Sequence, residues 1–186
     1  GDNGKAGIKN QDEAKAIKEE LEKADFTVSK VSTKKTPRQP APPFITSTLQ
    51  QEAWRRFHFT AKMTMATAQQ LYEGLPIGEE GSVGLITYMR TDSTHVAPSA
   101  LVEVRNFINE KYGAEYLPAH ARSFSHKVKG AQEAHEAIRP TKVWRTPASI
   151  KQYLNTTQYK IYNLIWQRMV ASQMAEATFE NTTIDI

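Results

Sequence analysis

The sequence of 186 residues contains no cysteine, which excludes disulfides, thiol nucleophiles and thiolate metal sites. No apolar run is long enough to span a membrane, and no signal peptide is visible at the N-terminus. A strong excess of one charge is also lacking: the net charge is +4, which fits a polyanionic partner without requiring one. We therefore expect a soluble, cytoplasmic protein that makes no contact with membranes.

The distribution of charge is more informative than its sum. Acidic residues concentrate between positions 12 and 22, whereas basic residues gather at 30–38, 55–62 and 122–129. Arg55 and Arg56 lie next to Trp54, and such a mixture of cations and aromatic rings can hold phosphates and stack on bases. Arg55 and Arg56 are therefore candidate DNA contacts.

The two ends of the chain differ in composition from its middle. Asn10 and Glu13 have the spacing of a capping box and predict a helix over 11–24, followed by a strand over 25–32. Residues 34–43 contain four prolines and predict a stiff linker. Residues 177–186 are rich in Thr and β-branched types and predict a strand. This strand ends without a turn, so we expect the chain to be part of a larger protein, with segments 1–43 and 175–186 flanking a separate domain at 44–174.

The middle of the chain is predicted to be mainly helical. The expected helices are 48–57 with a capping box at Ser47 and Gln50, 61–73 after Thr60, 99–112, a short one over 131–141 that ends at Pro140, and 147–174 with a break near Asn155. The predicted fold class is therefore mainly α with a β-rich flanking part, an α+β arrangement.

Residues 84–93 (GLITYMRTDS) form the most informative stretch. An apolar run ends in a polar turn after Arg90, which predicts a short buried strand that presents its last residues at an open edge. In an extended backbone Tyr88 and Arg90 leave the same face. A phenol that attacks phosphorus, beside a planar cation that holds phosphate oxygens, is a plausible pair for phosphoryl transfer. Taken alone, such a pair is more often a core tyrosine and a surface charge.

Three stretches in order, 43–50 (PFITSTLQ), 84–93 and 135–141 (HEAIRPT), resemble the type IA DNA topoisomerases. The resemblance runs from about residue 8 to the C-terminus and favours the bacterial topoisomerase I branch over topoisomerase III. The topoisomerase half of a reverse gyrase remains an alternative. The resemblance implies that a helical, winged-helix-like tyrosine domain is inserted between two pieces of a β-rich arch domain.

The resemblance also implies the roles of individual residues. Tyr88 would break one DNA strand, keep its 5′ phosphate and reseal it, so that negative supercoils relax. Only about one free phenol in a thousand is ionised at pH 7, so a neighbour must stabilise the developing phenolate or take the proton. Arg90 is the candidate for holding the phosphate. His135 would approach the scissile phosphate and donate a hydrogen bond to it.

Other polar residues of these stretches are candidate DNA contacts. Hydroxyl groups of Thr87, Thr91 and Ser93 can bond phosphate or deoxyribose, although the same residues are common in turns. Arg139 follows His135 by four residues, so on a helix it would share its face and reach phosphate. A helix-terminal cation favoured by the helix dipole is an equal alternative for Arg139.

An acidic Asp-x-Asp-x-Glu pattern, which the family carries in a separate domain that binds Mg²⁺, is absent from the sequence. The resemblance therefore implies an incomplete enzyme that is inactive alone, with no metal ligands of its own. Its expected partners are single-stranded DNA and the missing metal-binding domain of the same polypeptide, in a monomer associated with the nucleoid. A non-catalytic DNA-binding module and a protein-interaction domain are the competing hypotheses.

Overall fold

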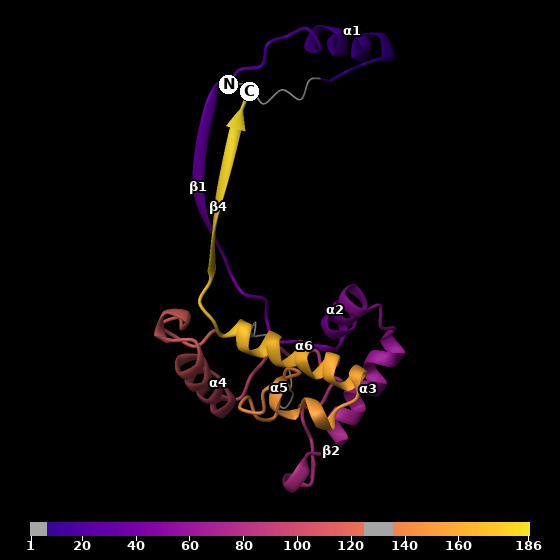
Figure 1. Ribbon diagram of the computed structural model, residues 1–186, viewed down its shortest axis with the longest axis vertical. Coiled ribbons are helices and arrows are strands. Elements are labelled where there is room, and N and C mark those ends of the chain that lie inside the picture. The colour runs from indigo at the N-terminus through magenta and orange to yellow at the C-terminus, as the bar shows by residue number, and fades with distance from the viewer. Residues whose placement is uncertain (1–6, 125–135) are drawn as a thin grey trace, which may run out of the picture. The chain divides into compact units, whose positions relative to one another are not determined.

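The computed structural model describes residues 7–124 and 136–186, and these residues fall into two compact units. One unit holds the described residues up to Thr36 together with Thr178–Ile186, and the other is Pro37–Ala177. The chain therefore passes from the first unit to the second and back again. Helices dominate the second unit, and the longest strands belong mainly to the first (Figure 1).

Helix α1 (Gln11–Leu21) confirms the helix that the capping box predicts. The Asn10 side chain accepts a hydrogen bond from the Glu13 main-chain N–H at 2.8 Å, and the Glu13 carboxylate accepts one from the N–H of Lys9, also at 2.8 Å. These bonds satisfy N–H groups that the first turn cannot pair internally. No residue of the helix is buried, so its stability rests on local interactions.

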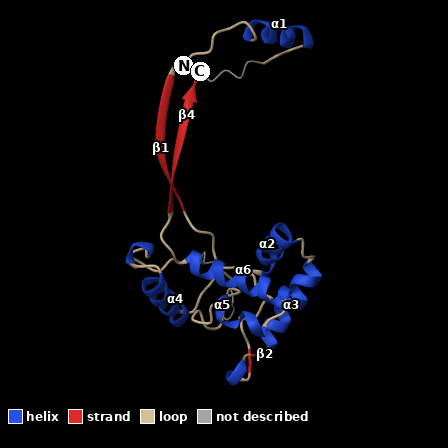
Figure 2. Ribbon diagram, in the orientation of Figure 1, coloured by secondary structure: helices blue, strands red, loops and turns tan. Residues whose placement is uncertain are grey.

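Strands β1 (Lys30–Arg38) and β4 (Ala177–Asp185) pair with each other in a two-stranded sheet (Figure 2). They run antiparallel, because Ser29 bonds Asp185 while Asn181 bonds Thr36. All residues of both strands are exposed. This sheet confirms the strand predicted at 177–186.

The first strand lies later in the sequence than predicted, and the prediction of a linker over 34–43 is partly wrong. Residues 25–29 are not in the strand, whereas 34–38 are. Pro37 is one residue from the end of β1. Each strand of a two-stranded sheet has one edge without a partner, and a proline whose nitrogen faces that edge removes no hydrogen bond between the strands. Pairing with the Thr-rich β4 thus overrides the effect of a single proline.

The second unit is built around α6 (Thr156–Ser172), which contacts α2 (Thr46–Phe57), α3 (Ala61–Glu73), α4 (Pro98–Lys111) and the short α5 (Pro147–Ile150). In Figure 1, α2 and α3 lie toward the right-hand end of this helix and α4 lies toward its left-hand end. The remaining elements are a small hairpin of β2 (Leu75–Pro76) and β3 (Ser82–Val83), and the 3₁₀ turns Gly78–Glu80, Ala114–Tyr116 and Lys151–Tyr153. The hairpin occupies a segment predicted as loop.

One hydrophobic core joins these elements. Its fully buried members come from every part of the unit: Phe44, Leu49, Leu71, Leu85, Ile108, Ile138, Ile161 and Ile165. Burying such a side chain contributes roughly 1.5–3 kcal/mol relative to leaving it in water. The Tyr162 hydroxyl donates to the Arg145 carbonyl at 2.6 Å, and Trp166 Nε1 donates to the Val143 carbonyl at 2.8 Å. The core therefore also fixes the turn before α5.

Most helix boundaries follow the predicted capping residues. Thr60 caps α3 through the N–H of Met63, and Asn155 begins α6 with a capping box, which confirms the predicted break. Gly74 and Gly113 follow α3 and α4 with φ of 119° and 109°, values that favour glycine. Helix α2 begins at Thr46, two residues before the prediction.

The capping box predicted at Ser47 and Gln50 is wrong. Thr48 Oγ1 instead accepts a hydrogen bond from the N–H of Ile45 at 3.1 Å. Thr48, the third residue of α2, thus pairs the N–H of Ile45, the residue before the helix. The helix begins at Thr46 and not at residue 48 as predicted.

The short helix predicted over 131–141 is also wrong where the structure describes it. Residues 136–141 are extended: Ile138 bridges Phe44 and Pro140 bridges Ile86. Tertiary pairing on both sides of this segment overrides its helical composition. Residues 131–135, with His135, lie outside the described residues.

Candidate active site

The backbone of residues 84–87 is fixed on two sides. The Leu85 N–H donates to the Leu71 carbonyl in α3 at 2.7 Å. The Thr87 N–H donates to the Arg139 carbonyl at 2.9 Å, and the Thr141 N–H donates to the Leu85 carbonyl at 3.0 Å. The predicted strand is thus an extended segment held between a helix end and residues 139–141, and it gives the residues that follow a rigid base.

From residue 88 onward, exposure alternates along the chain. Tyr88, Arg90 and Asp92 are exposed, whereas Met89 and Thr91 are 1% and 8% exposed. The backbone bends at Thr87, Met89 and Arg90, so the strand does not continue to Arg90 as predicted, and the shared face of Tyr88 and Arg90 stays a prediction. The apolar Met89 anchors this stretch to the core.

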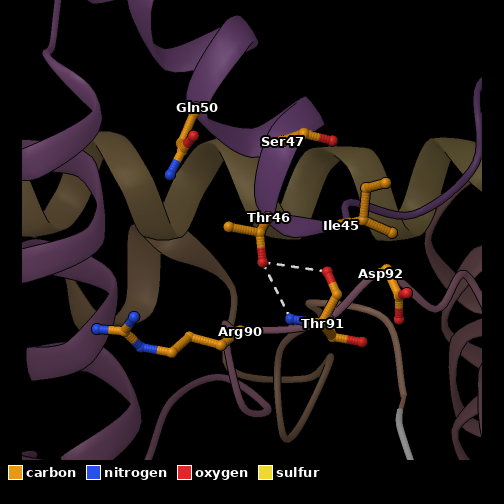
Figure 3. Close-up of a pocket in the computed structure, with 7 residues that line it drawn as sticks. All are labelled: Ile45, Thr46, Ser47, Gln50, Arg90, Thr91 and Asp92. Atoms are coloured by element: carbon orange, nitrogen blue, oxygen red, sulfur yellow. Dashed lines mark hydrogen bonds between the residues drawn. The ribbon is translucent and has the colours of Figure 1, made fainter.

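Two of the three candidate catalytic side chains, Tyr88 and Arg90, have no polar partner among the residues that the structure describes. No hydrogen bond to the Tyr88 hydroxyl is present there, and Tyr88 is 43% exposed. Arg90 forms no hydrogen bond or ion pair within the same residues, and Figure 3 shows its guanidinium directed away from Asp92. Within residues 7–124 and 136–186, both groups therefore remain available to a ligand.

Arg90 lines a pocket of about 430 Å³, together with Thr91, Asp92 and the first turn of α2 (Figure 3). Ile45, directly before α2, and Thr46, Ser47 and Gln50 within it contribute to the lining. The Arg90 guanidinium and the positive end of the α2 dipole favour an anion in this pocket, whereas the Asp92 carboxylate in its lining opposes one. Tyr88 does not line the pocket itself; it lies two residues before Arg90.

Thr46 joins α2 to the segment that carries Arg90. Its N–H donates to the Thr91 carbonyl at 2.9 Å, and its hydroxyl accepts from the Thr91 N–H at 2.9 Å. The same hydroxyl donates to the Met89 carbonyl at 2.8 Å. Sequence reasoning missed this residue, because the capping pattern pointed to Ser47. The signal available was its place within the stretch 43–50 that resembles the topoisomerases.

The hydroxyl groups predicted to bind DNA have partners inside the protein. Thr87 Oγ1 donates to the Ala137 carbonyl at 2.6 Å and accepts from the Arg139 N–H at 3.0 Å. Thr91 Oγ1 accepts from the Ser93 N–H at 3.1 Å, and Ser93 Oγ accepts from the N–H two residues further on at 3.1 Å. These bonds fit the turn-forming alternative, and contact of Thr87, Thr91 and Ser93 with DNA stays a prediction.

Arg139 also has an internal role. Its guanidinium pairs with the Glu136 carboxylate at 2.7 Å, and its side chain is 12% exposed. The other carboxylate oxygen of Glu136 accepts from the N–H of Ala97, directly before α4, at 2.7 Å. Because 136–141 is extended, the argument that placed Arg139 on a helical face with His135 is wrong. The pair fixes the start of α4 instead.

Arg55 and Arg56 lie on the surface of α2. Both bind the carboxylate of Glu52, at 2.7 and 2.6 Å, and their side chains are 71% and 52% exposed. The hydrogen bond from Arg56 lowers the pKa of Glu52, although burial acts in the opposite direction. Two oriented guanidinium groups therefore share one buried carboxylate, beside Trp54, which is 57% exposed.

A metal site and a membrane span are both missing from the part of the chain that the structure describes. Within residues 7–124 and 136–186, no three or more His, Asp or Glu side chains come together in a way that could hold a metal ion. None of the helices there combines the length and the apolar character needed to cross a bilayer.

Comparison with known proteins shows the family. A sequence profile described as DNA topoisomerase matches residues 2–186. DNA topoisomerase 1 of Rickettsia typhi is 50% identical over 182 residues, which are 98% of this chain and 23% of that protein. DNA topoisomerase 1 of Xylella fastidiosa (strain Temecula1) is 48% identical over 182 residues, 96% of this chain and 22% of that protein. Full-length topoisomerase I from Thermotoga maritima matches the fold with a TM-score of 0.77 at 42% identity, covering 92% of this chain and 27% of the other.

The chain belongs to the type IA DNA topoisomerases. Its relatives described here are bacterial and are named topoisomerase 1 or topoisomerase I, so the resemblance based on three short stretches is confirmed over nearly the whole sequence. The chain spans less than a quarter of the length of the Rickettsia and Xylella proteins, at 23% and 22%.

Proposed function

We propose that this chain supplies the nucleophile of a site that cleaves and reseals single-stranded DNA, so that the complete enzyme relaxes negative supercoils. The observation that carries the proposal is the contrast within 84–93: Tyr88 and Arg90 are exposed and free of polar partners among the described residues, whereas neighbouring hydroxyls are bonded internally. An exposed hydroxyl and an exposed guanidinium without internal partners are suited to contact a bound DNA strand.

In the proposed reaction the Tyr88 phenol oxygen attacks a backbone phosphorus. A bond from this oxygen to phosphorus forms, the bond from phosphorus to the 3′ oxygen breaks, the phenol loses its proton and the 3′ oxygen gains one. The DNA 5′ phosphate stays on the tyrosine until the 3′ hydroxyl attacks in return. One phosphodiester replaces another, so no ATP is needed to reseal the strand.

Arg90 is proposed to hold the phosphate that Tyr88 attacks. Its planar guanidinium can donate two parallel hydrogen bonds to phosphate oxygens and offset the charge that develops there. The support is its exposure two residues after Tyr88 and its place in the wall of the pocket beside α2. His135 is proposed to donate to the same phosphate, from a segment outside the described residues.

The Mg²⁺ of the complete enzyme is proposed to bind in a domain that this chain does not include. The described residues offer no cluster of acidic ligands, so no step of the reaction is assigned here to a metal held by this chain. We expect the chain alone to neither cleave nor relax DNA. We also propose that the complete enzyme is a monomer in the cytoplasm, associated with the nucleoid.

The domain roles are part of the same proposal. We assign the tyrosine domain, expected at 44–174, to the unit Pro37–Ala177, and the arch pieces to the unit that contains most of β1 and β4. The boundaries of the units fall at Thr36 and Ala177, close to the ends of the paired strands. Two chain crossings between units suit a domain that moves relative to its neighbour.

Arg55 and Arg56 are proposed to contact DNA phosphates away from the reacting bond, with Trp54 as a surface for base stacking. Their exposure and their fixed pairing with Glu52 support this role. The same surface would serve a DNA-binding module without chemistry, which is the second candidate function.

A trapping experiment separates the two functions. The complete enzyme is mixed with Mg²⁺ and a single-stranded oligonucleotide labelled on either side of the cleavage point, and the reaction is stopped with denaturant. We expect the label on the 5′-phosphate fragment to stay with the protein. A module that only binds DNA forms no adduct that survives denaturation.

A further inference from the structure

The ring of Tyr88 contacts the ring of Tyr72, which lies in the last turn of α3. The ring centroids are 5.3 Å apart and the planes are inclined by 65°, the edge-to-face geometry that aromatic pairs prefer. Tyr72 is 41% exposed and Tyr88 is 43% exposed, so the pair stands at the surface rather than in the core. The Tyr88 hydroxyl has no hydrogen bond within the described chain. The contact with the Tyr72 ring is therefore the interaction there that restricts the orientation of the Tyr88 side chain.

The backbone of residues 84 and 85 is packed closely against the end of α3. A Cβ atom on Gly84 would lie 2.8 Å from the Tyr72 carbonyl oxygen, so a side chain at position 84 would push the segment away from α3. The adjacent N–H of Leu85 donates to the Leu71 carbonyl at 2.7 Å. The end of α3 and the base of the segment that carries Tyr88 are therefore held at a fixed distance, and Tyr72 has a fixed position from which to act.

We propose that Tyr72 is a positioning residue for Tyr88: its ring restricts the rotamers of the nucleophile and sets the direction from which the phenol oxygen meets phosphorus. The inference rests on the proposed role of Tyr88. An exposed phenol without a hydrogen bond samples several rotamers, and only those that bring the oxygen to about 3–3.5 Å from phosphorus along the line of attack react. The contact therefore raises the rate of cleavage and leaves DNA affinity unchanged.

The test uses the complete enzyme under single-turnover conditions, with Mg²⁺ and saturating single-stranded oligonucleotide. We expect Tyr72→Ala to form the covalent adduct about tenfold more slowly, since a misdirected nucleophile reacts in a small fraction of its orientations. Tyr72→Phe keeps the ring and is expected to retain the wild-type rate. Tyr116→Ala is the matched control, because it removes another half-exposed tyrosine ring, 48% exposed, away from the site.

Two further measurements separate positioning from a general loss of structure. DNA affinity is measured with Tyr88→Phe in the background, so that no strand is cut, and we expect Tyr72→Ala to leave it unchanged. Tyr72→Leu keeps an apolar side chain that favours helix but lacks a ring, and it is expected to be as slow as Tyr72→Ala.

Three results would overturn the inference: a wild-type rate in both Tyr72→Ala and Tyr72→Leu, a slow Tyr72→Phe that assigns the role to the hydroxyl, or a lower DNA affinity that accounts for the slower cleavage. An adduct on a residue other than Tyr88 would instead overturn the proposed function.

Discussion

Two kinds of polar side chain lie within one short segment of this protein. Thr87 and Thr91 face inward and bond main-chain groups of residues 137–139 and Ser93, whereas Tyr88 and Arg90 face outward without a polar partner in the described chain. A hydrogen-bond donor without a protein partner costs little folding free energy when water can reach it and much more when it is buried. Only an exposed side chain can therefore lack a protein partner at low cost. Thr87 and Thr91 stabilise the backbone of the segment, whereas Tyr88 and Arg90 remain accessible to a ligand.

The largest effect is expected at the outward tyrosine. Tyr88→Phe removes only the attacking oxygen, so cleavage and adduct formation should be abolished in the complete enzyme. Thermal stability should stay near that of the wild type, because the hydroxyl makes no hydrogen bond among the described residues. Adduct trapping and a melting curve measure the two properties, and an adduct formed by this variant would show that the nucleophile lies elsewhere.

Arg90→Lys should have the next largest effect. Lysine keeps the charge but offers a point donor where two parallel bonds to phosphate are needed. We expect cleavage to slow by about a hundredfold, as for the loss of one donor to a developing anion. Single-turnover cleavage at saturating DNA provides the measurement, with Lys62→Ala as a control for losing a distant cation. Normal relaxation by Arg90→Lys would remove this residue from the mechanism.

The inward side of the comparison is tested at Thr46. Thr46→Val keeps the shape of the side chain but leaves the Thr91 N–H without its acceptor, at a cost of about 1–3 kcal/mol in unfolding free energy. Thr46→Ser retains the hydroxyl and should be close to wild type. Unfolding is followed by tryptophan fluorescence, because Trp54, Trp144 and Trp166 all lie in the unit Pro37–Ala177. Equal stability of the two variants would contradict the assignment.

The smallest effect is expected at Glu52, where charges are paired instead of free. Its pKa is lowered in the folded protein by the hydrogen bond from Arg56, so its contribution is present above the pKa of the unfolded chain and is lost as pH falls through the lowered value. Glu52→Gln should reduce stability by about 1 kcal/mol at pH 7, since its arginine partners are largely exposed. Urea unfolding at pH 7 and below pH 4 should show the difference shrinking in acid; a constant difference would exclude this ionic origin.

Local signals predicted much of this architecture. Asn10, Thr60 and Asn155 begin helices because a side-chain oxygen can satisfy N–H groups within the next turn, an interaction that adjacent residues encode. The position of β1 and the extended form of 136–141 depend on partners far away in the sequence, so no local pattern contains them.

The candidate site divides in the same way. Tyr88 and Arg90 could be predicted because they lie within a stretch that resembles the topoisomerases; their chemistry and spacing alone do not distinguish them from a core tyrosine and a surface charge. The inward orientation of Arg139 and the role of Thr46 depend on which carboxylate or carbonyl lies nearby in the fold. In the sequence, a threonine or arginine that bonds other protein groups cannot be distinguished from one that binds DNA, because the residue type is the same.

The most direct test of the central claim is to locate the covalent bond. The complete enzyme is trapped on a short oligonucleotide with Mg²⁺, the adduct is digested with protease and nuclease, and the modified peptide is sequenced by mass spectrometry. The account predicts a nucleotide joined through its 5′ phosphate to Tyr88. A modification on any other residue, or attachment through a 3′ phosphate, would contradict it.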